Sequence, residues 1–151
     1  MSISAARAAV SGRGRSVALR YLAVAAIANL GWEVAQLPLY TVWRTGTPGE
    51  LTYDVIHCTL GDVLLLGATL FVALLLAGDR AWPWRSYVRV ALLATVLGIA
   101  FTIFSEWLNV EVLRSWAYAP EMPLLPLLGT GLSPLLQWVI IPPAALALVK
   151  P

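Results

Sequence analysis

Four long apolar stretches restrict what this chain can fold into. They lie at residues 17–40, 55–77, 87–108 and 124–149. Each is close to or longer than the roughly 20 residues that a helix needs to cross the hydrocarbon core of a bilayer. Because 60% of the 151 residues are hydrophobic and 12% are charged, the chain has too little polar surface to cover a soluble core. The sequence therefore predicts an all-α membrane protein, a bundle of four transmembrane helices surrounded by the lipid bilayer.

Basic residues are distributed unevenly between the two ends of such a bundle. One end would hold Arg7, Arg13, Arg15, Arg20, Arg80, Arg85, Arg89 and Lys150, and the other end Arg44 and Arg114. Since Lys and Arg accumulate in cytoplasmic segments, this asymmetry predicts that both termini are cytoplasmic. We expect residues 1–16 to form a basic cytoplasmic tail and residues 17–151 a single transmembrane domain. The expected location is the cell membrane, specifically a bacterial inner membrane, and no basic cluster is typical of nucleic-acid binding.

The fourth apolar stretch contains residues that interrupt helices. Ser133 and Pro134 have the pattern of an N-cap followed by proline at the first helical position, and Gly129 and Gly131 precede them. We expect a broken or kinked helix near residues 129–134 and a kink at Pro142-Pro143. Non-helical backbone at membrane depth is tolerated only where it is buried in protein or lines a wet cavity.

Polar residues inside the first apolar stretch form one stripe. Asn29, Glu33, Gln36 and Tyr40 are spaced four, three and four residues apart, so a helix places them on one face. A charge at bilayer depth costs at least a few kcal/mol, so we expect Glu33 to face the other helices. Polar residues of the other three stretches fall at a similar depth, in the outer half of the bundle: Asp62, Glu106 and Ser133.

Together these residues predict a polar pocket open to the outer side, roofed by the loop at residues 116–123. We expect three carboxyl groups to be the catalytic candidates: Glu33, Asp62 and Glu106. The ligand-binding candidates are polar or aromatic residues at the same level: Asn29, Gln36, Asn109, Trp116, Tyr118, Ser133 and Gln137. His57 with Glu33 and Glu106 could bind a divalent transition metal, because imidazole and carboxylate ligands suit Zn, Fe and Mn. His57 and Asp62 are about 140° apart on a regular helix, so we do not expect both to point straight into one small site.

Each of these residues also has a purely structural interpretation. Buried carboxyl and amide groups can join helices by hydrogen bonds, His57 can lie at the interface, and Trp116 and Tyr118 can belong to an aromatic belt. The functional hypotheses are accordingly three. The first is a protein that binds a small ligand or metal, including an enzyme acting on a lipid-like substrate. The second is a structural or assembly subunit of a larger membrane complex, and the third is a homo-oligomeric proton or solute transporter.

Overall fold

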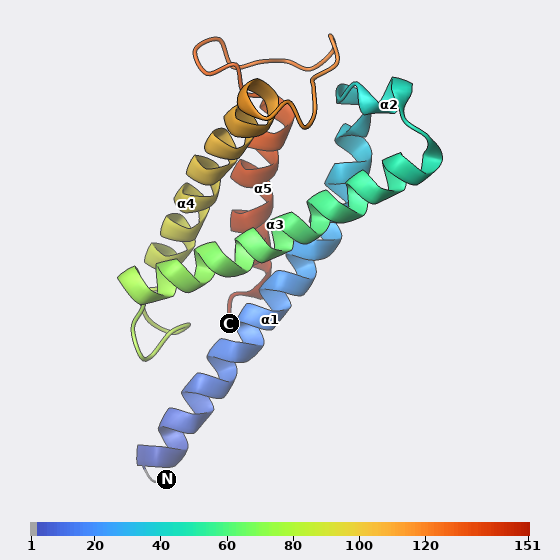
Figure 1. Cartoon of the computed structure of the whole chain (residues 1–151). Helices are drawn as coiled ribbons and strands as arrows, with labels where there is room; N and C mark the ends of the chain where they lie inside the picture. Colours follow the sequence, from blue (N-terminus) through green and yellow to red (C-terminus); the bar gives the residue numbers. More distant parts are fainter. Residues whose placement is uncertain (1–2) are drawn as a thin grey trace.

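Four long helices build the structure: α1 (Ile3–Gln36), α3 (Pro48–Ala77), α4 (Tyr87–Trp107) and α5 (Leu132–Val149). This computed structural model describes residues 3–151, with side chains from residue 12 onward. Helix α1 packs against α3 and α5, and α4 packs against the same two helices, so α1 and α4 are diagonal in the bundle. The C-terminus and the loop between α3 and α4 lie at one end, beyond which the N-terminal part of α1 projects (Figure 1).

The predicted helical class is confirmed. Residues 3–151 contain isolated β-bridges but no strand, and four helical segments are long and apolar enough to cross a membrane: Gly12–Leu39, Pro48–Ala77, Tyr87–Val112 and Leu132–Val149. Large apolar side chains cover the outside of the bundle, as Ile27 and Leu64 illustrate at 75% exposure each. A soluble protein rarely exposes such a continuous apolar surface.

Two helices begin earlier than the hydrophobic pattern predicts. Helix α1 extends back to Ile3, so residues 3–16 of the expected basic tail are helical. Helix α3 begins at Pro48 because Thr47 caps it. The Thr47 hydroxyl accepts a hydrogen bond from the Glu50 backbone N–H at 3.3 Å, and the Glu50 carboxylate accepts one from the Thr47 N–H at 2.7 Å. This reciprocal arrangement is a capping box.

The fourth helix begins later than the apolar stretch at 124–149. Residues 124–131 form a loop closed by the Leu132 N–H, which donates to the Pro123 carbonyl at 2.7 Å. The N-cap position belongs to Gly131, so the expectation that Ser133 caps the helix was wrong: the Ser133 side chain is hydrogen-bonded to α1 instead. Pro142 and Pro143 lie within α5, where they cannot donate to the carbonyls one turn earlier.

The apolar core occupies the half of the bundle nearest the C-terminus. It contains buried side chains from all four long helices: Val17, Tyr21, Ala25, Leu66, Leu70, Ala73, Val90, Ala94, Ile141, Ala145, Leu146 and Val149. Above it, the backbone of α4 comes very close to α5. A Cβ atom at Gly98 would lie 2.1 Å from the Trp138 ring, so only glycine permits this approach.

Short elements close the opposite end. The 3₁₀ turn η1 (Leu37–Leu39) and α2 (Val42–Thr45) follow α1, and the π-helical turn η2 (Leu108–Val112) extends α4. Two backbone hydrogen bonds attach the loop after η2 to the segment that follows α1. The Thr41 N–H donates to the Ala117 carbonyl and the Ala119 N–H donates to the Leu39 carbonyl, both at 2.9 Å. The loop is thus held over the end of the bundle.

Candidate functional site

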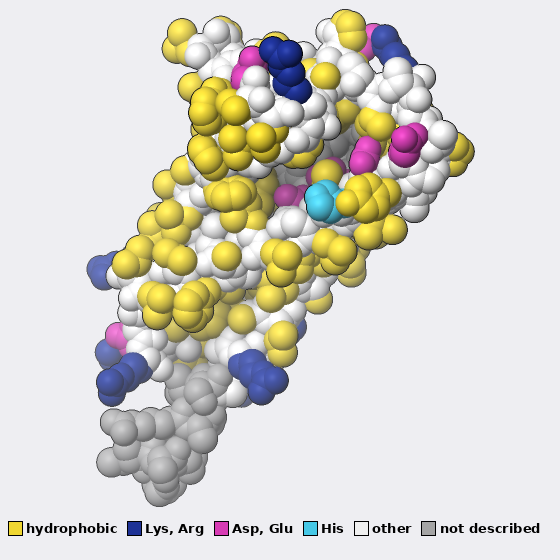
Figure 2. Space-filling view, viewed as in Figure 1, with side chains coloured by type: hydrophobic (Ala, Val, Ile, Leu, Met, Phe, Trp, Pro, Cys, Tyr) yellow, Lys and Arg dark blue, Asp and Glu magenta, His cyan; other side chains and the backbone are white. Residues whose placement is uncertain are grey.

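A cavity of about 720 Å³ opens in the half of the bundle away from the C-terminus. Side chains from all four long helices line it, and Ser115, Trp116 and Ala117 of the loop cover it. Figure 2 shows the hollow beside His57, with acidic side chains visible inside it. Cavities of this volume are in the range of small-molecule sites. The loop therefore forms the roof that the sequence predicts, through its first residues.

The side-chain amide of Gln137 on α5 holds one wall together. Its Nε2 atom donates to Asn29 Oδ1 at 2.8 Å, to Glu33 Oε1 at 2.9 Å and to Asp62 Oδ2 at 2.7 Å. Three helices thus meet at one nitrogen. Asn29, Glu33 and Gln36 are 2%, 8% and 5% exposed, so the polar stripe of the first apolar stretch faces the bundle interior.

The side-chain nitrogen of Gln137 has one more hydrogen-bond acceptor around it than it has hydrogens. An amide nitrogen carries two hydrogens, whereas Gln137 Nε2 has three acceptors within 2.9 Å. One acceptor must obtain a hydrogen from another source. A single proton between the carboxyl groups of Glu33 and Asp62 would supply it, as carboxyl pairs that share a site commonly do.

A second amide extends the wall toward the roof. Gln36 Nε2 donates to Glu33 Oε1 at 2.9 Å and to Gln137 Oε1 at 3.3 Å. The side-chain oxygen of Gln36, Oε1, accepts a hydrogen bond from the Ser133 hydroxyl at 2.8 Å. Ser133 Oγ in turn accepts one from Trp32 Nε1 at 3.3 Å. The chain of hydrogen bonds fixes α1 against the first turn of α5 and orients the Glu33 carboxyl.

Glu106 lies on the diagonal helix α4 and has different partners. Its carboxyl group accepts a hydrogen bond from the Tyr118 hydroxyl, which itself accepts from the Gly131 backbone N–H at 2.9 Å. The pKa of Tyr118 is raised above its ordinary value, mainly by burial and secondly by the neighbouring Glu106 carboxylate. Tyr118 therefore remains a neutral donor, and its hydroxyl ties Glu106 to the loop that precedes α5.

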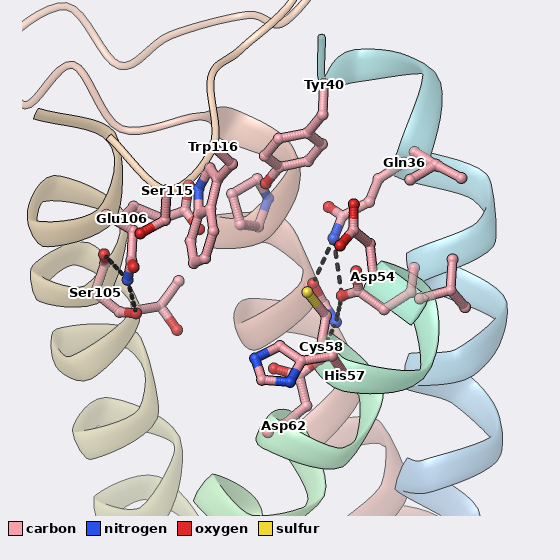
Figure 3. Close-up of a pocket in the computed structure, with 18 of the residues that line it drawn as sticks. Gln36, Tyr40, Asp54, His57, Cys58, Asp62, Ser105, Glu106, Ser115 and Trp116 are labelled. Carbon is pink, nitrogen blue, oxygen red and sulfur yellow. Dashed lines mark hydrogen bonds between the residues drawn. The ribbon is translucent and has the colours of Figure 1, made fainter. Parts of the chain in front are cut away.

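Helix α3 contributes a wide face to the cavity. Asp54, His57, Cys58, Gly61 and Asp62 all line it, and the His57 ring stacks on Tyr53 with 5.4 Å between ring centroids. Figure 3 shows His57, Cys58 and Asp62 on the side opposite Glu106 and Trp116. The expectation that His57 and Asp62 could not both reach a small site does not apply, because the cavity is wide enough for residues spread around α3.

Comparison with family models, curated proteins and solved structures finds no match. The site is therefore interpreted from its own residues. Among the described side chains, no group of three or more His, Cys, Asp and Glu residues is arranged to hold a metal ion. The geometry gives the proposed metal set of His57, Glu33 and Glu106 no support, because Glu33 and Glu106 lie on diagonal helices and have separate hydrogen-bond partners.

Most of the other residues expected at the site do lie together. The cavity is lined by Glu33, Gln36, His57, Asp62, Glu106, Asn109, Trp116 and Gln137. Three expected residues do not line the cavity themselves but are hydrogen-bonded to residues that do: Asn29 to Gln137, Ser133 to Gln36 and Tyr118 to Glu106. Asn109 bonds to its own helix, donating to the Ser105 carbonyl at 2.9 Å, which fits a structural role.

Several lining residues were not among the predicted site residues. Helical periodicity places Asp54 on the face of His57 and Tyr40 on the Asn29 stripe, but neither was chosen as a candidate site residue, and both line the cavity. Thr102 lies one turn before Glu106 on α4 and is 5% exposed, and its hydroxyl has no hydrogen-bond partner among the described residues. Helical spacing places Thr102 on the same polar side of the third stretch as Glu106 and Asn109, but a threonine hydroxyl inside a helix is usually satisfied by its own backbone, so it was not a site candidate.

The arrangement can bind and can exchange protons. The carboxyl oxygens of Glu33, Asp62 and Glu106 that lack intramolecular donors are available to a molecule in the cavity. A pair of carboxyls joined through Gln137 can accept or release one proton without breaking the amide contacts. These are the properties required for holding a polar ligand and for general acid–base chemistry.

Proposed function

We propose that the chain is a multi-pass membrane protein whose outer-facing polar cavity binds a small lipid-like ligand. The cavity itself carries this proposal: about 720 Å³ of space between four helices, with carboxyl groups from three of them. Carboxyl groups in an apolar bundle are costly unless they serve packing or function. Packing alone would require no open space beside them.

The orientation follows from charge. The chain segments at the end that includes the C-terminus contain most of the basic residues: Arg7, Arg13, Arg15, Arg20, Arg80, Arg85, Arg89 and Lys150. Arg44 and Arg114 belong to the other end. The positive-inside rule then places both termini in the cytoplasm and the cavity toward the outer surface of a bacterial inner membrane.

The packing below the cavity favours binding over transport. A pathway across the membrane needs polar groups or water along its whole length. In this bundle the apolar core, with Tyr21, Leu70, Ala73, Val90 and Leu146 buried, occupies the half between the cavity and the proposed cytoplasmic end. We therefore rank a binding protein, with acid–base chemistry on the bound molecule as its enzymatic form, above a transporter.

Filling the cavity tests this function. Gly61 lines the cavity, and a Cβ atom there would meet nothing within 4 Å, so Gly61→Leu places its side chain in open space. Gly31 on α1 also has nothing within 4 Å but does not line the cavity, so Gly31→Leu is the matched control. Both changes replace a helical glycine with a better helix former.

The readout is the set of small molecules that co-purify with the protein, determined by native mass spectrometry and solvent extraction. Wild type and Gly31→Leu should retain a bound molecule at near-stoichiometric amounts. Gly61→Leu should lose it while remaining folded. Equal retention by all three proteins, or no bound molecule in wild type purified from its native membrane, would contradict the proposed function.

A further inference from the structure

We propose that the ligand is an amphiphile with a positively charged amine head group and an apolar tail. The proposal rests on the proposed function, because it assigns a chemical class to the molecule in the same cavity. The head group would lie among the carboxyl groups of α1, α3 and α4. The tail would leave the cavity between α3 and α4.

The charge of the cavity wall selects the head group. Four carboxyl groups line the cavity: Glu33, Asp54, Asp62 and Glu106. His57 is present, but none of the lining residues is Lys or Arg. The ion pair found among the described residues joins Arg44 to Glu121. It includes none of these four carboxyl groups and no other residue that lines the cavity. A phosphate or carboxylate head group would enter this space without a counter-charge, whereas an amine would gain several.

The side-chain amide donors beside the carboxyl groups are already used. The amides of Gln36 and Gln137 donate to Glu33 and its neighbours, and Tyr118 donates to Glu106. The remaining carboxyl oxygens are free to accept, and the Trp116 N–H, unpartnered among the described residues, is a free donor at the roof. A protonated amine carries donors only, so it matches the free carboxyl oxygens.

An unpartnered hydroxyl lies close to Glu106. Thr102 is four residues before Glu106, so the two side chains are neighbours on one face of α4. Thr102 lines the cavity, is 5% exposed, and has no hydrogen-bond partner among the described residues. A buried hydroxyl without a partner is unfavourable, and an amine placed beside Glu106 can donate to it.

Aromatic rings complete the head-group site. Tyr40, Trp116 and Trp138 line the cavity together with the carboxyl groups. Aromatic faces attract cations through the ring quadrupole, and aromatic rings commonly surround bound alkylammonium groups. Figure 3 shows Tyr40 and Trp116 on the roof side of the cavity, with Asp62 and Glu106 below and beside them.

The tail is assigned from the apolar side of the cavity. Leu64, Leu65 and Ala68 of α3 and Phe101 of α4 line this side. Leu64 and Phe101 are 75% and 47% exposed, so they reach both the cavity and the outside of the bundle. In a bilayer that outside surface contacts acyl chains, and a ligand tail can lie across these residues without entering water.

Three probes with the same twelve-carbon chain test the head group: dodecylamine, dodecanol and dodecanoate. The protein is placed in nanodiscs of neutral lipid, and binding is measured against identical nanodiscs that carry Gly61→Leu, which corrects for partition into the lipid. Dodecylamine should bind at least about tenfold more tightly than dodecanol, which corresponds to the loss of one favourable charge interaction. Dodecanoate should not bind.

Variants locate the head group. Glu106→Gln and Asp62→Asn should each weaken binding of dodecylamine about tenfold and leave the weaker binding of dodecanol unchanged. If these variants do not fold, Thr102→Val provides the second test. It removes a hydroxyl that has no partner, so the fold should persist while dodecylamine binds more weakly.

The two proposals fail in different ways. If dodecanol or dodecanoate binds as well as dodecylamine, the amine class is wrong, but a ligand site remains. The same conclusion follows if no probe binds while wild type retains a native molecule that Gly61→Leu displaces. If no probe binds and Gly61→Leu displaces nothing, the proposed function itself fails.

Discussion

Glu33 on α1 and Asp62 on α3 accept hydrogen bonds from the same nitrogen atom, Nε2 of Gln137 on α5, at 2.9 and 2.7 Å. One side chain therefore joins three helices and two carboxyl groups beside the cavity. The stability of the bundle and the geometry of the site depend on the same contact.

Gln137→Leu should destabilise the protein. The change keeps the volume of the side chain but leaves Glu33, Asp62 and Asn29 without their shared donor. We expect the free energy of unfolding to fall by about 1–3 kcal/mol, the cost of leaving a buried polar group unsatisfied. Reversible unfolding in mixed detergent micelles measures it. Val139→Ala, on the exposed side of the same helix, is the control, and an equal loss in both variants would show that Gln137 has no special role.

Tyr118→Phe should loosen the loop before α5. The hydroxyl connects Glu106 to the Gly131 N–H, so its removal breaks both contacts. We expect faster hydrogen exchange at the Gly131 amide and faster proteolysis within residues 113–131. Tyr53→Phe serves for comparison, because Tyr53 is 64% exposed. Unchanged exchange at Gly131 in Tyr118→Phe would mean that the loop is held by its backbone contacts alone.

Gly98→Ala should separate α4 from α5. The added Cβ atom would lie 2.1 Å from the Trp138 ring, so the ring or a helix must move, at a cost of about 1–3 kcal/mol. Gly67→Ala provides a matched comparison within another helix, because its Cβ would lie 4.0 Å from the Leu22 side chain, an ordinary contact. The thermal midpoint should fall for Gly98→Ala and stay or rise for Gly67→Ala. The opposite order would contradict the packing of these helices.

Cysteine labelling tests the orientation. Cys58 is the sole cysteine, so Cys58→Ser gives a background without thiols. In intact cells, a membrane-impermeant maleimide should label Leu127→Cys in the loop before α5. It should label Asp79→Cys in the loop after α3 only after the membrane is permeabilised. The reverse pattern would place the cavity on the cytoplasmic side.

The helices and the polar stripe could be predicted because both are local properties. Apolar length identifies a spanning helix, and the four- and three-residue spacing of Asn29, Glu33 and Gln36 fixes one face. The start of α3 is also encoded locally, in the capping box of Thr47 and Glu50, although the second apolar stretch begins only at residue 55. Proline is compatible with the first turn of a helix, and the structure uses it there.

The contacts that make the site could not be predicted in this way. The hydrogen bonds from Trp32 to Ser133 and from Tyr118 to Glu106 depend on which helices are neighbours and how the loop folds back. Helical spacing gives the face on which a residue lies and does not give its partner. The width of the cavity, which admits both His57 and Asp62, has the same origin in tertiary packing.

A high-resolution structure of the wild-type protein in native-lipid nanodiscs would show directly whether the cavity holds a ligand. We expect continuous non-protein density in the cavity. Its compact end should lie between Asp62 and Glu106, and its elongated end should pass between Leu64 and Phe101. A cavity filled by repacked side chains, or one that contains only separate water molecules, would contradict this expectation.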